Sequence, residues 1–220
     1  MRKELLENYT VYVYCDSSVT ADEREMLVKA MESAAPIFGC YFMFSGSGGF
    51  EVPGGGRLKK SVDEMVAAAA LNDKGQISAK DMLDMASEVF GKMARKGALI
   101  VFTSRDLFLK ESWCFGAARV GGSVSVQSMA RFRQLEPEVK QAVITRTLRH
   151  ELGHIHRLAA DPDRACTENK YGRHCTRSGC TMRQSVKLSI LIEHAREEDP
   201  KNCLCDLCRA DLERFKRKNY

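Results

Sequence analysis

The segment HELGHIHRLAAD, which begins at residue 150, contains the residue types of a hydrolytic metal site. On a helix, His150 and His154 lie about 40° apart around the axis and about 6 Å apart along it, so both imidazoles can reach one ion. Glu151 lies about 60° from His154 on the other side, where its carboxylate borders the ion. The spacing therefore predicts two zinc ligands and a general base on one helix.

A third protein ligand is not identified by this segment alone. His156 lies about 200° from His154 around the helix and faces away from the ion. Asp161 could supply a carboxylate after a short turn, and a residue further along the chain is the other alternative. A surface helix with incidental histidines is disfavoured, because three of the five histidines fall within seven residues, with a glutamate in the required place.

The helix that carries this pair is predicted over about 137 to 157. Pro137 suits its first turn, and an apolar stripe at helical spacing consists of Ile144, Leu148, Leu152 and Ile155. Upstream, strands and helices alternate. Strands are expected at 9 to 14, 39 to 44 and 97 to 103, and helices at 21 to 34, 59 to 71 and 79 to 94. WCFGAARVGGSVSVQS predicts two further strands in a hairpin around Gly121 and Gly122.

A glycine-rich stretch, SGSGGFEVPGGGR at 45 to 57, follows the second predicted strand. Gly46, Gly48 and Gly49 do not complete G-x-G-x-x-G, because Glu51 occupies the next required position, and no G-K-[ST] follows. We expect a flexible surface loop without a ligand role.

Composition is that of a soluble globular protein. The chain has 220 residues, 44% hydrophobic and 29% charged, enough for a substantial core in one domain or a domain with a small appendage. The net charge of +5 is spread along the chain apart from the tail RFKRKN, which disfavours nucleic-acid binding. No signal peptide and no transmembrane run is apparent. We expect a cytoplasmic monomer without membrane or nucleic-acid partners.

The cysteines point to metal binding. There are nine, and six fall after residue 165, including the runs CTRSGC and CLCDLC. In a chain without an export signal, this clustering indicates metal thiolates in a reducing cytoplasm rather than disulfides. Cys15, Cys40 and Cys114 lie in apolar surroundings and are expected to be small buried side chains.

Taken together, these motifs resemble those of the archaemetzincins, a family of zinc metallopeptidases with the pattern HExxHxxGxxHC, four residues, C-x-M and a later CxxC. HELGH matches the start of that pattern, and the segment from Ile100 to Phe132 is similar to the family's strands before the active-site helix. The resemblance covers about residues 97 to 208. Its matching residues after the helix are His174, Cys175, Cys180, Met182, Cys205 and Cys208.

The resemblance implies an α/β, metzincin-like fold. This fold has a mixed twisted sheet with an antiparallel edge strand, an active-site helix and a small zinc-bound C-terminal subdomain. We expect an N-terminal α/β subdomain with the active-site helix over 1–156. Residues 157–220 would then form a C-terminal subdomain that holds the third ligand, the methionine turn and a four-cysteine zinc site.

One departure from the family pattern concerns the third histidine. The family's Gly would fall at Arg157 and its His at Ala160, whereas the His-Cys pair reappears at His174 and Cys175, as though about fourteen residues were inserted. Lengthening a surface loop costs only about 0.6 kcal/mol per doubling, so the insertion is compatible with a metal site. The resemblance favours His174 as third ligand, with Asp161 as the next alternative, followed by His156 or no third protein ligand.

Two zinc ions per chain are implied by the resemblance, one catalytic and one structural. His150, His154 and His174 would hold the first, over an apolar floor formed by Met182. The second would be held by Cys175, Cys180, Cys205 and Cys208, and folding of this cluster would also position His174 and the methionine turn. Cys166 and Cys203 have no counterpart in the family and either could replace a neighbouring ligand. His194 is expected on the surface or on a C-terminal helix.

The resemblance implies a zinc-dependent metallopeptidase in which Glu151 acts as general base on a zinc-activated water. The strand near 115 to 118 would lie along the cleft, where an extended peptide or protein substrate could add as a further strand. The alternative is a catalytically inactive, zinc-stabilised binding module. An intact Glu151 favours the peptidase, because a binding module has no use for a base beside the metal.

Overall fold

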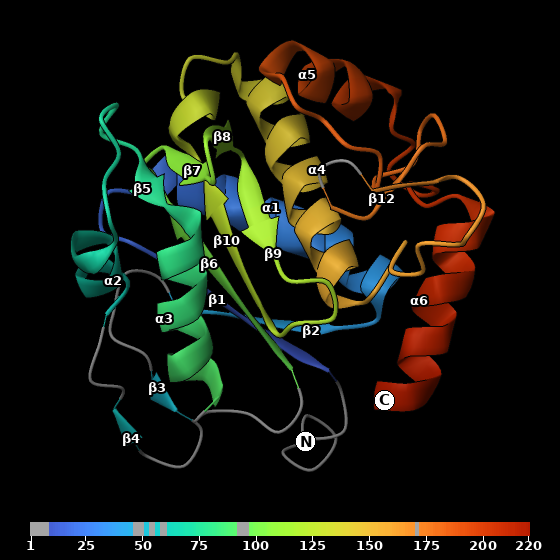
Figure 1. The fold of residues 1–220 in the computed structure, drawn as a ribbon, viewed down its shortest axis with the longest axis horizontal. Coiled ribbons are helices and arrows are strands. Elements are labelled where there is room, and N and C mark those ends of the chain that lie inside the picture. The colour runs from blue at the N-terminus through green and yellow to red at the C-terminus, as the bar shows by residue number, and fades with distance from the viewer. Residues whose placement is uncertain (1–8, 46–50, 53–55, 58–60, 92–96, 170–171) are drawn as a thin grey trace.

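A five-stranded sheet with the order β2-β1-β6-β10-β9 organises the fold (Figure 1). The computed structural model describes residues 9–45, 51–52, 56–57, 61–91, 97–169 and 172–220. Four strands run parallel to one another, and β9 runs antiparallel to β10 at one edge. The mixed sheet with an antiparallel edge strand is therefore confirmed. Its strands are β1 (Thr10–Cys15), β2 (Tyr41–Phe44), β6 (Ala98–Thr103), β9 (Gly116–Ala118) and β10 (Val124–Ser128).

Helices cover both faces of this sheet. Successive side chains of a strand point to opposite faces, so β1 sends Val11 and Val13 into one core and Tyr12 and Tyr14 into the other. The first core is closed by α1 (Ala21–Phe38) and α4 (Pro137–Ile155), and the second by α2 (Val62–Ala68) and α3 (Ala79–Gly91). The long helix predicted from the histidine motif is thus α4.

Local sequence signals account for the helix boundaries. Thr20 and Glu23 form a reciprocal capping box at the start of α1, and Ser61 and Glu64 form another before α2. Pro137 occupies the first turn of α4, where its missing N–H costs nothing. Within the described residues, none of the helices has the length and apolar composition needed to cross a bilayer.

Short elements connect these layers. A second sheet joins β5 (Ile77–Ser78), β7 (Leu107–Leu109) and β8 (Ser112–Cys114), and β3 (Glu51–Val52) pairs with β4 (Gly56–Arg57). A 3-10 turn, η2, spans Ala130–Phe132. The rest of the predicted glycine-rich loop after Ser45, and the last residues of the helix predicted to reach 94, lie outside the described residues.

The chain beyond α4 forms two short strands and two helices, which lie on one side of Figure 1 in orange and red. An antiparallel pair, β11 (Thr167–Glu168) with β12 (His174–Cys175), is followed by α5 (Leu188–Glu197) and α6 (Asp206–Asn219). Lys216 and Tyr220 of this part donate hydrogen bonds to the carbonyl oxygens of Ile37 and Phe38. These contacts anchor α6 beside the end of α1.

Candidate metal centre

Helix α4 presents His150 and His154 to the same point. Their Nε2 atoms lie 3.2 Å apart, as expected for residues one helical turn apart on one face. The two rings are nearly perpendicular, with centroids 4.8 Å apart. Both nitrogens can therefore approach one ion from different directions.

His174 is the third member of this group. It lies on β12, which the chain reaches after the segment that follows α4. Its Nε2 lies 3.1 Å from that of His154, and ligand atoms of all three histidines lie within 4.8 Å of one another. Asp161 instead accepts a hydrogen bond from the amide of Asp163 and lines a surface hollow with Arg157. The structure therefore brings His174, and not Asp161, to the helical pair.

His156 and His194 lie away from this group. His156 is fully buried, with Nδ1 2.8 Å from the carbonyl oxygen of Leu152 and Nε2 3.3 Å from the Tyr220 hydroxyl. It faces away from the ion position, as its helical angle predicts. His194 lies on α5 and is buried, with Nδ1 2.8 Å from the Ser185 hydroxyl. Of the two positions expected for His194, the C-terminal helix is confirmed and the surface is not, because α5 packs this residue inward.

The three imidazoles fit a zinc ion. Zinc–nitrogen bonds of about 2.0–2.1 Å in tetrahedral geometry place ligand nitrogens about 3.3 Å apart, close to the separations of 3.1 and 3.2 Å. Burial lowers the pKa of His154 to about 3 and that of His174 to about 4, so both are neutral at physiological pH. Burial and the two neighbouring histidines likewise hold the pKa of His150 well below its ordinary value. Neutral imidazoles offer the lone pairs that a cation requires.

A hydrogen bond to a backbone carbonyl orients the imidazole ring of His150. Its Nδ1 lies 2.8 Å from the Thr181 carbonyl oxygen, which can only accept, so the proton resides on Nδ1 and the lone pair of Nε2 faces the other histidines. Among the described residues, no hydrogen-bond partner is found for the buried Nδ1 of His154.

Glu151 follows His150 on α4 and lies in a dry environment. It is 5% exposed, and burial raises the pKa of its carboxyl to about 8. A nearby dication favours the ionised form and opposes this shift. Gly116 of β9 passes close by: a Cβ there would lie 2.9 Å from Oε1 of Glu151. The edge strand therefore runs beside the carboxylate only because residue 116 has no side chain.

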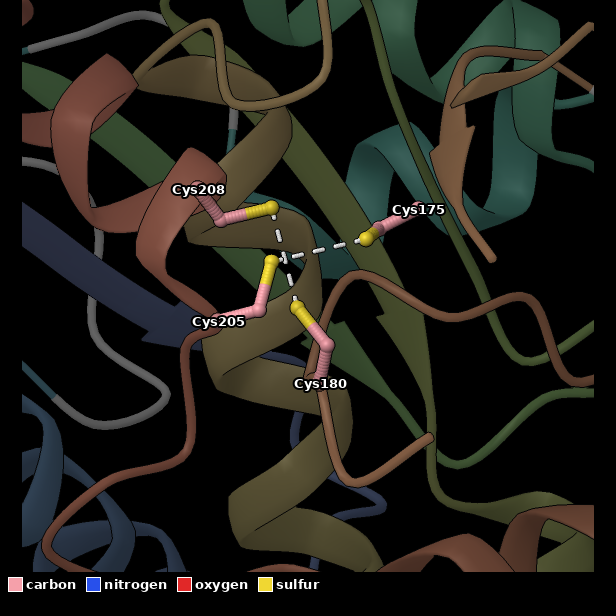
Figure 2. A group of neighbouring side chains, drawn as sticks. All are labelled: Cys175, Cys180, Cys205 and Cys208. Carbon is pink, nitrogen blue, oxygen red and sulfur yellow. Dashed lines mark hydrogen bonds between the residues drawn. The ribbon is translucent and has the colours of Figure 1, made fainter. Parts of the chain in front are cut away.

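Four cysteines form a second group, in which the side chains of Cys175, Cys180, Cys205 and Cys208 converge (Figure 2). The Sγ atoms lie 3.6 Å apart in the pair Cys175 and Cys205 and in the pair Cys180 and Cys208. Zinc–sulfur bonds of about 2.3 Å in a tetrahedron give about 3.8 Å, so the group fits a closed zinc site. Cys166 and Cys203 are not part of it.

Arg164, in the segment between α4 and β12, places a positive charge beside this cysteine group. Hydrogen bonds from Cys180 and Cys208 lower the pKa of the Cys175 thiol. Arg164 places both terminal nitrogens 3.5 Å from Cys208 Sγ and forms an ion pair with Asp211 at 2.7 Å. A guanidinium beside thiolates favours their ionised form. The segment between α4 and β12 therefore supports the cysteine group as well as returning the chain to His174.

Arg157, which stands where the family pattern has Gly, has a left-handed backbone conformation. Its φ is +61°, a left-handed conformation that costs an L-residue about 1–2 kcal/mol and that glycine adopts freely. The family pattern has Gly at this position after the helix. Arg157 therefore adopts a backbone conformation that suits glycine better than arginine.

Sequence reasoning missed several supporting residues. Arg146, Thr181 and Glu198 contact the histidine helix or the turn after Cys180, and all are buried. Helical spacing places Arg146 on the same face as His150, one turn away. Its partner Glu198 lies 52 residues away, however, and no local pattern connects them.

An α/β protein that pairs a three-histidine group with a four-cysteine group is the class that this fold and these sites define. It has the archaemetzincin fold. The structure of Methanopyrus kandleri archaemetzincin matches with a TM-score of 0.67 and 19% identity, covering 96% of this chain and 97% of that one. Archaeoglobus fulgidus archaemetzincin in complex with malonate matches with a TM-score of 0.63 and 18% identity over 92% and 99%. A zinc-dependent peptidase from Methanocorpusculum labreanum has a TM-score of 0.63 and 16% identity, with the same coverage.

Sequence similarity points the same way. A curated archaemetzincin of Methanopyrus kandleri is 32% identical over 111 residues, which are 50% of this chain and 62% of that protein. The match thus spans less than two thirds of that relative. No protein-family model matches the chain. The resemblance inferred from the motifs is confirmed by the fold and by this relative.

Proposed function

We propose that the chain is a zinc-dependent peptidase whose catalytic zinc is held by His150, His154 and His174. The observation that carries the proposal is the convergence of three neutral Nε2 atoms, at separations of 3.1 and 3.2 Å, two of them from the helix that also carries the buried carboxyl of Glu151. When bound there, zinc supplies Lewis-acid activation of water and of a scissile carbonyl. The four cysteines hold a second, structural zinc, which gives two ions per chain.

Glu151 performs the proton transfers in this proposal. Its carboxylate takes a proton from the attacking water and then delivers it to the leaving amine. Its low exposure keeps bulk water from competing for the carboxylate. The Thr181 carbonyl holds His150 in the tautomer with a free Nε2.

Strand β9 provides the place for an extended peptide. It is the last strand at its edge of the described sheet, so one row of its backbone groups faces away from β10. Gly116 brings this edge next to Glu151. A peptide that pairs with β9 is thereby held with its backbone beside the base.

Glu151→Gln tests the proposal. The variant should keep two zinc ions and the parent's melting temperature but lose peptide hydrolysis by about 10²-fold or more, because general base catalysis is removed. Glu193→Gln, at an exposed site on α5, is the matched control and should hydrolyse peptides like the parent. Equal hydrolysis by Glu151→Gln and parent would refute the role of this carboxylate. A parent that binds one zinc and cleaves no peptide would instead support the binding module.

A further inference from the structure

The turn from Cys180 to Arg183 lies between the two candidate metal sites. Cys180 contributes its sulfur to the cysteine group, and the next residue, Thr181, accepts the hydrogen bond from His150 Nδ1. The Met182 carbonyl oxygen accepts from the amide of Cys175, 2.9 Å away. Any displacement of this turn would therefore change the geometry of both groups.

Arg146 donates hydrogen bonds to both ends of this turn. It lies on α4 one turn before His150 and is 2% exposed. Its Nη2 donates to the carbonyl oxygens of Cys180 and Arg183, at 3.1 and 3.2 Å. The turn is thus attached to α4 by Arg146 on either side of the Thr181 carbonyl that orients His150.

A buried carboxylate keeps Arg146 in place. Glu198 forms ion pairs with Arg146 and with Arg149, and all three side chains are at most 4% exposed. Arg149 turns the other way and donates to the carbonyl oxygens of Ser33 and Pro200. The two arginines therefore share one partner and one helix, but only Arg146 touches the turn.

Burying two guanidinium groups against one carboxylate is costly, and apolar side chains could fill the same volume more cheaply. An apolar side chain, however, has no directional hydrogen-bond donors. The planar fork of Arg146 can hold two carbonyls and one carboxylate at once, which a single ammonium cannot do in the same geometry. This points to a role for Arg146 in geometry rather than in net stability.

We propose that Arg146 is a positioning residue that couples the two metal sites. By clamping the Cys180–Arg183 turn to α4, it lets a metal bound by the four cysteines fix the Thr181 carbonyl, and so raise the affinity of the three histidines for their metal. The coupling is reciprocal, because linkage requires it. The proposal rests on the metal ligation proposed above but not on peptide hydrolysis, so its failure and the failure of the proposed activity are separate results.

The first test compares Arg146→Lys with Arg149→Lys in the full chain. Both variants keep a positive charge beside Glu198, and only the first removes the fork that holds the turn. Zinc affinities would be measured by chelator competition. The histidine site should bind about tenfold more weakly in Arg146→Lys, as is usual when an outer partner of a ligand is lost, and stay within about twofold of the parent in Arg149→Lys. Equal losses in both variants, or no loss in either, would overturn the assignment.

The second test measures the coupling without disabling a ligand. Cd²⁺, which prefers thiolates, is added first to fill the cysteine site, and Co²⁺ is then titrated while its visible absorption reports binding to imidazoles. In the parent, the preload should tighten Co²⁺ binding at the histidine site about tenfold; in Arg146→Lys it should bring no gain, and the Co²⁺ spectrum should change. A similar gain in both proteins, or none in the parent, would refute the coupling.

Discussion

The side chain of Met182 fills the space that a Cβ on Gly153 would need. A Cβ on Gly153 would overlap the sulfur of Met182 and lie 3.1 Å from its Cε, so the fully buried methionine could not keep its position if residue 153 carried a side chain. The packing of Met182 against α4 therefore depends on a missing side chain in the helix itself. This relationship makes the HELGH glycine a packing requirement as well as part of a motif.

Gly153→Ala should displace Met182 and destabilise the protein. Overpacking of this kind costs about 1–3 kcal/mol, only partly offset by the better helix propensity of alanine, so the melting temperature should fall by about 4 °C. Gly91→Ala is the control, because no atom of the described residues lies within 4 Å of a Cβ there. Thermal unfolding followed by circular dichroism checks both. A Gly153→Ala variant as stable as the parent would contradict the packing argument.

His174→Ala should release the zinc of the histidine site and leave the zinc of the cysteine site bound. Two imidazoles alone bind zinc much more weakly than three. Asp161→Ala should keep both ions, because Asp161 is exposed and its carboxylate accepts a hydrogen bond from a neighbouring amide. Metal analysis after dialysis measures the two contents. Loss of zinc from Asp161→Ala but not from His174→Ala would mean that the inserted segment rearranges to supply the ligand.

Arg157→Gly should stabilise the chain. The left-handed φ of +61° costs an arginine about 1–2 kcal/mol, while glycine loses about 0.5–1 kcal/mol through its more flexible unfolded state. The net gain of about 0.5–1 kcal/mol corresponds to a melting temperature about 2 °C higher. Arg157→Ala, which removes the side chain but retains the strained conformation, should bring no such gain. A rise of the same size in both variants would assign the effect to the side chain instead.

Glu23→Gln should destabilise the protein at neutral pH and much less in acid. Burial opposes ionisation of this carboxyl, but hydrogen bonds from Arg133, Thr20 and Lys140 outweigh it and lower its pKa from 4.5 to about 2. A group with a depressed folded-state pKa stabilises the protein above its unfolded pKa and loses this contribution as the pH falls. We expect a loss of about 2 kcal/mol, or about 5 °C, at pH 7. The difference should shrink from about pH 4.5 downward.

The matched control for this pH experiment is Glu25→Gln, on the exposed side of the same helix. Glu25 forms an exposed ion pair with Lys29 on the helix surface, so its removal should change the melting temperature little at any pH. A difference between Glu23→Gln and parent that stays constant from pH 7 to pH 3 would show that the carboxylate charge is not what stabilises α1.

Much of the fold is local in origin, and the sequence alone was sufficient for it. Period-two and helical patterns predicted strands and helices that the structure contains, among them β1, β6, the β9–β10 hairpin and α4. The pairing of His150 and His154 also follows from helix geometry, since residues four apart share a face. Clustering of six cysteines indicated a metal site, and the resemblance to the archaemetzincins identified the four that the structure brings together.

Only the tertiary structure decided where the chain returns after α4. Sequence separation does not specify where a loop ends, because closing a longer loop adds little free energy, and so His174 and Asp161 were both open alternatives. The residues that support the two sites were also beyond local patterns: Arg146 meets Glu198 across 52 positions, and Arg164 meets Cys208 across 44. Such contacts depend on how α4, the inserted segment and α6 pack together, and that packing is a property of the whole core rather than of any segment within it.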